Sequence, residues 1–459
     1  MDVPGGKRGR PAPAAEWTPT ITALGGGGFA CSLLSNEGPP QGTDVVVRIT
    51  RWRGIADHIR NHEALAAVLT WGVPKIVAGS IVQYPSIGHV DFPRRYVDAM
   101  NRNDTCAAKV LEWSDLIADD VERTPITVYR MEYANQGSFE HYQWSSAQHR
   151  RNDPKRFAFL AIGLIYAAGW RLGFQHSDLT PDNLLVHNDP LSGEIFPWLA
   201  DFDLATLGAQ PRKTGSLYVA PPEAFLARPA EAEAEAEVLC AYDIWSLGMC
   251  LLGKAITPKG APRLYMPIPE HLVTFQGLHI QSGVDVNVYR RLFTYYAICA
   301  FHSVFAARPI ERYQLYTSER ALLTRVRDRD LEHFRTSLYT VVKARYETPM
   351  NAIPAELRNL LFRMLDLTPS ARVFNGDMAS YFYDPYFTMV ADRAHLMATR
   401  IAPILGIEAM PNVMHRRRAP VADWVRSLVA AGITPLCGRH AGCGRRARYV
   451  DVETGEFVC

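Results

Sequence analysis

Two acids and an amide in the middle of the chain could hold a nucleotide and its metal ion. Asp178 and Asn183 stand in the segment His-Ser-Asp-Leu-Thr-Pro-Asp-Asn, and Asp201 follows in Ala-Asp-Phe-Asp. Magnesium takes oxygen ligands and shares them with substrate phosphates, so carboxylate and amide oxygens on neighbouring turns suit it. The spacing of these residues therefore indicates a nucleotide–metal site.

The elements that must position this site are apolar helices and short strands. We expect a buried helix over Phe157–Gly173 before the first segment and strands at Leu184–Val186 and Trp198–Ala200 between the two segments. A second buried helix is expected over Tyr242–Leu252. Helices thus dominate the rear of the chain.

The front of the chain is strand-like instead. From Ile21 to about Gln83 the pattern predicts strands, with a β-branched run at Val45–Val47, and a further strand is expected at Ile126–Met131. One helix interrupts it over Ala56–Leu69, with the expected stripe Ile59, Glu63, Ala66 and Ala67. A small β-rich part therefore precedes a larger helical part.

The composition is that of a globular protein. The 459 residues include 49 Lys and Arg against 47 Asp and Glu, a formal net charge of +2 that excludes a polycation built to coat nucleic acid. The apolar runs Ala158–Trp170 and Leu292–Ala307 are short of the roughly 20 residues that span a bilayer, and residues 1–20 lack an apolar signal segment. We expect an intracellular monomer in the cytoplasm or nucleus, with neither a membrane nor a nucleic-acid partner.

The ordered segments of the rear part resemble the signatures of eukaryotic-type protein kinases. Residues 176–183 resemble the catalytic loop, and residues 201–203 resemble the magnesium-binding D-F-G motif. Residues 215–223 resemble the end of the activation segment, and Asp243–Gly248 resembles the motif of the buried helix that follows it, with Arg372 as a candidate partner for Glu223. The divergent motifs and the Ala/Arg/Gly/Pro-rich composition would suit a large DNA virus, which would place the protein in the host cytoplasm.

The front part carries segments that surround ATP in this family. Residues 24–30 resemble the glycine-rich loop, residues 46–48 resemble the strand that carries the phosphate-binding lysine, and residues 131–134 resemble the adenine-binding hinge. The resemblance implies that ATP is held by Leu24, Gly25, Gly27, Phe29, Arg48, Met131, Glu132 and Tyr133, and that Glu63 pairs with Arg48 as part of the catalytic set.

The implied catalysis consists of positioning and charge neutralisation. Asp178 would orient the substrate hydroxyl and accept its proton, while Asn183 and Asp201 would hold Mg²⁺ on the phosphates of ATP. The text of the catalytic loop and Ser216 favour a Ser or Thr acceptor on a protein, although the sequence does not identify that protein.

Four positions depart from the family pattern. Arg48 replaces a lysine and is not interchangeable with it at a crowded phosphate site, and Ser177 replaces the arginine that reads activation-loop phosphorylation. Thr180 stands where Ser/Thr kinases carry a lysine, and Asp203 replaces the glycine of D-F-G, which restricts the backbone there. These departures favour a slow kinase or, as the alternative, a pseudokinase that binds nucleotide or partners without transferring phosphate.

A small Cys/His module ends the chain. Cys437, His440, Cys443 and Cys459 could close a tetrahedral Zn²⁺ site, and free thiols in a short hairpin are the alternative. The acidic repeat Ala230–Glu237 and the basic run Arg416–Arg418 are typical of solvated segments.

The predicted fold is α+β, a bilobal protein-kinase-like fold with a β-rich N-lobe and a larger helical C-lobe. We expect a flexible leader over residues 1–20 and a kinase-like domain over 21–390, with the N-lobe at about 21–133 and the C-lobe at about 134–390. A linker over 391–419 and a helix with the zinc module over 420–459 would follow. The predicted function is ATP- and Mg²⁺-dependent phosphorylation of protein Ser/Thr; a small-molecule kinase is a third reading, disfavoured by the motifs at 215–223 and 243–248.

Overall fold

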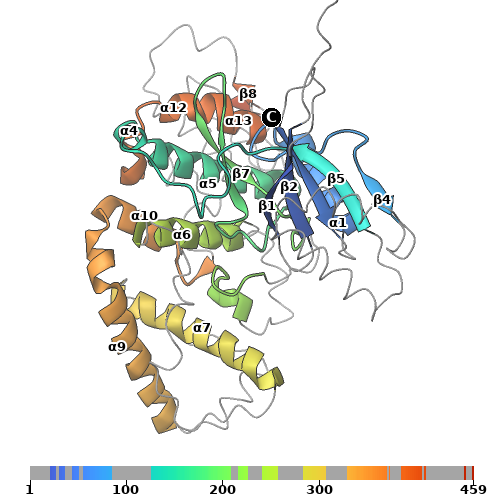
Figure 1. Cartoon of the computed structure of the whole chain (residues 1–459). Coiled ribbons are helices and arrows are strands. Elements are labelled where there is room, and N and C mark those ends of the chain that lie inside the picture. Colours follow the sequence, from blue (N-terminus) through green and yellow to red (C-terminus); the bar gives the residue numbers. More distant parts are fainter. Residues whose placement is uncertain are drawn as a thin grey trace, which may run out of the picture. The chain divides into compact units, whose positions relative to one another are not determined.

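The chain is a mixed helix-and-strand protein that divides into two compact units (Figure 1). Unit 1 comprises residues 1–55 and 75–133, and unit 2 comprises residues 56–74 and 134–459. The computed structural model describes residues 21–26, 30–36, 44–50, 55–84, 126–207, 215–225, 240–256, 283–305, 328–369, 372, 384–405, 408–409, 449–450 and 457–458.

Unit 1 contains an antiparallel sheet of five strands in the order β1-β2-β3-β5-β4. The strands are β1 (Ile21–Gly26), β2 (Ala30–Asn36), β3 (Asp44–Thr50), β4 (Val82–Tyr84) and β5 (Ile126–Glu132). β-Branched residues suit a pleated surface, and the run Val45–Val47 is buried in β3, between β2 and β5. The strands predicted at Val45–Val47 and Ile126–Met131 are confirmed.

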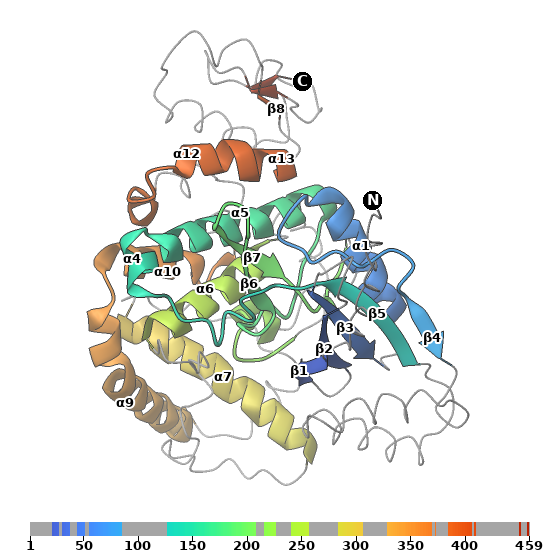
Figure 2. The ribbon, with the colours of Figure 1, turned by 45° about the horizontal axis from the view of Figure 1, so that its top comes forward.

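Unit 2 is mainly helical and has its core around α5. Its long helices are α1 (Ile55–Val68, from Ala56 onward), α5 (Asp153–Leu172), α6 (Ala241–Ile256), α7 (Gly283–Phe305), α9 (Asp328–Ala352) and α10 (Ala355–Met364), and the two-stranded sheet of β6 (Leu184–Asn188) and β7 (Ile195–Leu199) lies beside them. Figure 2 shows α6 on one side of α5 and the short helices of residues 393–405 on the other, and α7 lies alongside α9.

The length of α5 follows from its sequence and its ends. Almost all of its residues from Phe157 to Gly169 are buried, so the apolar run forms the centre of the core. Pro154 stands in the first turn, where its missing N–H costs nothing. Gly173 ends the helix in the left-handed conformation, with φ of 61° and its N–H donated to the last turn.

The segment after residue 392 packs on the outer side of α5. It consists of α12 (Arg393–Leu396), a π-helical turn at Met397–Ile401 and α13 (Ala402–Leu405). A Cβ at Gly163 of α5 would lie 2.5 Å from the Ile401 side chain, so the glycine permits the close approach. Trp71 Nε1 donates to the backbone oxygen of Arg400 at 2.8 Å, which ties this segment to the loop after α1.

The remaining described elements are short. They are α4 (Ser146–Arg150), the 3₁₀ turns Pro222–Phe225 and Pro385–Phe387, and a small sheet of β8 (Glu408–Ala409), β9 (Tyr449–Val450) and β10 (Phe457–Val458). Among the described helices, none combines the length and apolar character that crossing a bilayer would require.

The helices predicted near residues 157–173 and 242–252 are confirmed as α5 and α6, and the strands predicted near 184–186 and 198–200 are confirmed as β6 and β7, although β7 begins at Ile195. The helix predicted over Ala56–Leu69 is confirmed as α1; of its expected stripe, Glu63 and Ala67 are exposed, and the buried residues lie on a different face. The acidic repeat 230–237, the basic run 416–418 and most of the tail lie outside the described residues.

Candidate functional site

The loop that carries Asp178 is held by a buried carboxylate on α6. Asp243 Oδ2 accepts the backbone N–H of His176 at 2.7 Å, and Asp243 Oδ1 accepts that of Ser177 at 3.1 Å. Asp243 is buried, and a buried carboxylate needs such donors to offset the loss of its hydration. Ser177 has φ of 66°, which L residues rarely adopt, so this contact holds the loop in an unusual backbone conformation.

The Asp178 carboxylate is reached by a backbone amide from a distant segment. The N–H of Ser216 donates to Asp178 Oδ1 at 2.7 Å, and Asn183 Nδ2 donates to the Asp178 backbone oxygen at 2.8 Å. Burial raises the pKa of Asp178 above its ordinary value of 3.8. Hydrogen bonds from the backbone and the side chain of Ser216, together with His176, oppose this rise, and the charge of Asp201 adds to it. Asp178 is thus a carboxylate that Ser216 holds in place and that has an increased proton affinity.

Gly215 has no room for a side chain. A Cβ at this position would lie 2.5 Å from Asp178 Oδ1 and 2.6 Å from the Ser177 backbone oxygen. Separations this short do not occur between real Cβ atoms and their neighbours. The glycine therefore allows the 215–216 backbone to close on Asp178.

The segment Asp201–Asp203 is anchored by the phenylalanine between its two acids. Phe202 is fully buried, and its ring centroid lies 5.0 Å from that of His62 and 5.4 Å from that of His176. Asp201 has φ of 63°, a left-handed conformation that aspartate tolerates better than most residues. Next to it, the Ala200 N–H donates to the Asn183 backbone oxygen at 3.0 Å, which brings the two predicted metal ligands onto adjacent backbone.

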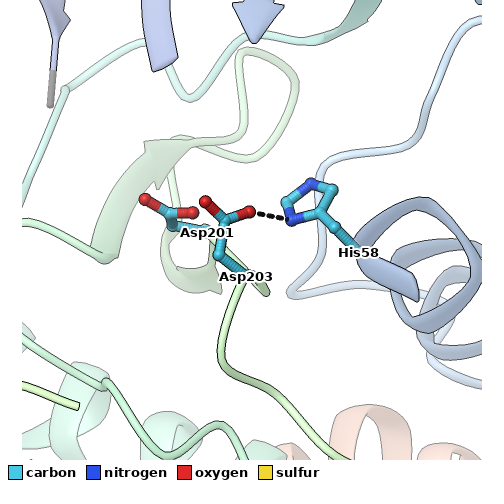
Figure 3. A group of neighbouring side chains, drawn as sticks. All are labelled: His58, Asp201 and Asp203. Carbon is cyan, nitrogen blue, oxygen red and sulfur yellow. Dashed lines mark ion pairs between the residues drawn. The ribbon is translucent and has the colours of Figure 1, made fainter. Parts of the chain in front are cut away.

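A histidine from α1 completes this group of side chains. Figure 3 shows the His58 imidazole pointing toward the Asp203 carboxylate, with Asp201 beside it. His58 Nδ1 and Asp203 Oδ1 are 2.6 Å apart; the imidazole is 1% exposed and the carboxylate 22%. One ligand atom from each of His58, Asp201 and Asp203 lies within 4.8 Å of the other two. The arrangement is a mixed nitrogen and oxygen cluster built by two elements of unit 2.

The buried face of α1 mixes polar with apolar residues, which is why it differs from the stripe expected from the sequence. Asn61 Nδ2 donates to the Ala205 backbone oxygen at 2.9 Å, and a ring nitrogen of His62 contacts the backbone oxygen of Pro74. His58 lies one turn before His62, and that spacing with Asn61 between them was the available signal for a buried polar face. Glu63, the predicted partner of Arg48, has an exposed side chain.

The segment that ends at Glu223 is fastened to the rear of unit 2. Arg372 donates from both terminal nitrogens to the two oxygens of Glu223, each at 2.6 Å, as the candidate pairing predicted. The Arg372 side chain is fully buried and lies over the Trp245 ring at 4.9 Å. Ser246 Oγ also donates to the Val219 backbone oxygen at 3.0 Å. These contacts fix the backbone that leads back to Gly215.

The predicted nucleotide-binding residues belong to unit 1. In β3, Arg48 is 6% exposed and pairs in register with Ser32 of β2 and Tyr129 of β5, and Met131 is also buried. Glu132 is tied to Lys75 by two hydrogen bonds of 2.9 Å, one through each backbone amide.

The structure also describes three other residues of the predicted nucleotide-binding set, Leu24, Gly25 and Tyr133. The Leu24 side chain is 44% exposed, and Gly25 pairs in register with Ser32 of β2. Burial and the charge of Asp44 raise the pKa of the half-buried Tyr133.

Several predicted sites stay predictions. Gly27, Phe29 and the zinc set Cys437, His440, Cys443 and Cys459 lie outside the described residues. Arg48 and Glu63 fall in separate units, so their ion pair also stays a prediction.

No protein-family model matches the chain, and no curated protein sequence matches it either. The functional assignment therefore depends on the residues and their geometry.

Proposed function

We propose that this protein is a protein kinase that transfers the γ-phosphate of ATP to Ser or Thr of a protein, with Mg²⁺ as cofactor. The observation that carries the proposal is the convergence of Asp178, Asn183 and the backbone before Asp201, joined by the Asn183 hydrogen bonds. A base and two oxygen ligands on adjacent loops are the minimum that phosphoryl transfer requires, because its transition state asks mainly for positioning and neutralisation of charge.

Asp178 has the contacts expected of the group that receives the hydroxyl proton. Its carboxylate accepts hydrogen bonds from the backbone and the side chain of Ser216, the residue beside which we place the substrate hydroxyl. The raised pKa of Asp178 favours proton uptake by its carboxylate. The hydrogen bond from Ser216 also fixes the orientation of the Asp178 carboxylate, which would otherwise be free to rotate.

The donor set of Asn183 and Asp201 fits Mg²⁺. Asn183 donates its Nδ2 to the Asp178 carbonyl, so its amide oxygen is the atom that a cation would take. Asp201 supplies a half-buried carboxylate oxygen. Bound with ATP, Mg²⁺ would neutralise charge on the phosphates, whereas this chain's own contribution is to hold the two ligands at fixed places.

The proposed acceptor is a Ser or Thr hydroxyl on a protein. Ser216 is half-buried beside Asp178. We therefore expect the substrate segment to lie against the backbone of residues 215–217. Thr180 contributes its hydroxyl to the Asn183 N–H at 3.3 Å instead of a cation to the phosphate. Losing one cationic contact costs roughly a power of ten in rate for each 1.4 kcal/mol, so we expect slow transfer.

A pseudokinase is the second candidate, and the contact between His58 and Asp203 favours it. This 2.6 Å contact ties the residue after Phe202 to α1 and opposes rearrangement of the segment that carries Asp201. Under this alternative the same residues would bind nucleotide without transferring phosphate.

Two measurements on the purified full chain separate these candidates. Thermal unfolding with and without Mg·ATP reports nucleotide binding, and transfer of γ-labelled phosphate to the chain itself and to a mixture of generic Ser/Thr substrates reports catalysis. The kinase predicts both stabilisation and transfer, with label on Ser or Thr after acid hydrolysis. Stabilisation without transfer would support the pseudokinase. If Mg·ATP neither stabilises the chain nor donates its phosphate, both candidate functions are excluded.

A further inference from the structure

We propose that His58, Asp201 and Asp203 form a binding site for a divalent transition cation, one that accepts imidazole nitrogen as well as carboxylate oxygen. The three ligand atoms lie within 4.8 Å of one another (Figure 3). The site goes beyond the proposed function, since it needs His58 and Asp203 but neither nucleotide nor Asn183. It shares only Asp201 with the proposed Mg²⁺ site.

The pair of His58 and Asp203 needs little adjustment to accept an ion. Metal–ligand bonds of about 2.1 Å place two neighbouring ligand atoms about 3.0 Å apart at a right angle and about 3.4 Å apart at a tetrahedral angle. His58 Nδ1 and Asp203 Oδ1 are now 2.6 Å apart. An ion between them would therefore separate the two side chains by less than about 1 Å, a movement that side-chain rotation can supply.

The charge of the cluster favours a cation. Asp178 lies close enough to Asp201 for the two carboxylates to interact, and Asp203 adds a third acid to the same region. A neutral imidazole is the form that binds a metal, so coordination requires no positive charge on His58. A divalent cation would offset two of the three negative charges.

The ligands come from elements that are held firmly. His58 is fully buried on α1, and Phe202 packs against His62 on the same helix with ring centroids 5.0 Å apart. Asn61 Nδ2 joins α1 to the Ala205 backbone oxygen at 2.9 Å. Because α1 is thus tied to the chain on both sides of Asp203, the histidine is pre-positioned for the two acids.

The donor set selects the class of metal. Mg²⁺ prefers oxygen ligands and retains several waters, whereas imidazole favours transition cations. The imidazole favours a first-row transition cation, and the two carboxylates make Mn²⁺ a suitable member of that class. Mn²⁺ is also the sharper probe here, because the cysteines of the tail would compete for Zn²⁺.

The test is Mn²⁺ binding to the EDTA-treated, nucleotide-free full chain, followed by electron paramagnetic resonance. We expect one site that binds Mn²⁺ at least about tenfold more tightly than Mg²⁺, with a ¹⁴N coupling from an imidazole in the spin-echo spectrum. His58→Gln keeps an amide donor toward Asp203, but glutamine is a poor metal ligand. This variant should lose the ¹⁴N coupling, and its affinity for Mn²⁺ should fall at least about tenfold. Asp203→Asn should lower the affinity for Mn²⁺ by a similar factor and retain the ¹⁴N coupling.

Matched controls keep the proposal falsifiable. His187→Gln removes a half-buried histidine of β6, and Asp182→Asn removes an exposed acid of the catalytic loop; both should leave Mn²⁺ binding unchanged. Asn183→Ala should also leave it unchanged, which separates this site from the proposed nucleotide-bound Mg²⁺ site. Equal Mn²⁺ affinity and an unchanged ¹⁴N coupling in folded His58→Gln would overturn the inference, whatever the outcome of the phosphate-transfer assay.

Discussion

The residues predicted to transfer phosphate, in unit 2, and the residues predicted to bind nucleotide, in unit 1, are held in different ways. In unit 2, the buried charged side chains of Asp243 and Arg372 fix the loop of residues 176–183 and the segment ending at Glu223, both from distant parts of the chain. In unit 1, the described residues predicted to bind nucleotide lie on or beside strands that pair through the backbone ladders of one antiparallel sheet.

This difference shows where each part of the site can fail. A sheet distributes its stability over many backbone hydrogen bonds, each of modest net value, so one substitution has a limited effect. A loop held by a buried ion depends on a single group, and removing one partner leaves the other buried without compensation. Substitutions in unit 2 should therefore cost more than substitutions in unit 1.

The largest stability effect should come from Arg372→Ala. The variant loses the bidentate pair with Glu223, the contact with Trp245 and two bonds to backbone oxygens. We expect the free energy of unfolding to fall by about 3 kcal/mol, at the lower end for broken buried pairs because Glu223 is partly solvated. Denaturant unfolding followed by tryptophan fluorescence measures it.

The matched control is Arg60→Ala, which breaks the exposed pair with Asp57 on α1. Exposed pairs of this spacing contribute only about 0.3 kcal/mol. Similar losses in the two variants would contradict the contrast between buried and exposed anchors.

Asp243→Asn should have the next largest effect. Asparagine has one acceptor oxygen and no negative charge, so it can accept the backbone N–H of either His176 or Ser177 but not of both. We expect the free energy of unfolding to fall by about 2 kcal/mol. Hydrogen exchange should show faster exchange at those two amides in particular. A loss spread evenly over unit 2, with these amides still protected, would indicate that the loop has another anchor.

Ser80→Ala tests the smaller dependence expected in unit 1. Ser80 Oγ accepts the Arg130 N–H at 3.0 Å and donates to the Arg130 backbone oxygen at 3.2 Å. We expect a loss of about 1 kcal/mol, which corresponds to about fivefold faster exchange of the Arg130 amide. A loss as large as that of Arg372→Ala would refute the difference between the two units.

Asp178→Asn should change stability in the opposite direction. Burial raises the pKa of Asp178 in the folded state, so its carboxyl contributes stability at low pH that is lost as the pH rises through the raised pKa. In nucleotide-free, metal-free buffer the variant should therefore be more stable than the wild type at pH 7, and the gain should shrink toward pH 3.8. A variant less stable at pH 7 would mean that the carboxylate, not its neutral form, is favoured by folding.

Much of the fold was accessible from the sequence because its signals are local. The apolar run of α5, the β-branched run of β3 and the strands around residues 184–199 each follow from short-range periodicity. The pairing of Arg372 with Glu223 was also predictable, because residues 215–223 resemble the end of a kinase activation segment and that resemblance implies an arginine partner for Glu223. The boundaries were less accurate, as the earlier start of β7 illustrates.

The polar face of α1 could not be predicted in the same way. Sequence patterns assign histidine and asparagine to solvent, yet His58, Asn61 and His62 are buried, because a carboxylate and two backbone oxygens from elsewhere satisfy them. The role of Gly215 likewise depends on Asp178 lying against it, a contact between residues far apart in sequence. Such features follow from tertiary contacts that no local pattern records.

The central claim is that Asp178 is the group that receives the substrate proton in a phosphoryl-transfer site. Its most direct test compares the transfer of γ-labelled phosphate by the wild type, by Asp178→Asn and by Asp182→Asn, which removes an exposed carboxylate from the same loop. The account predicts that Asp178→Asn lowers the rate at least about 100-fold while Asp182→Asn retains it within about threefold. Equal rates in Asp178→Asn and the wild type would contradict it.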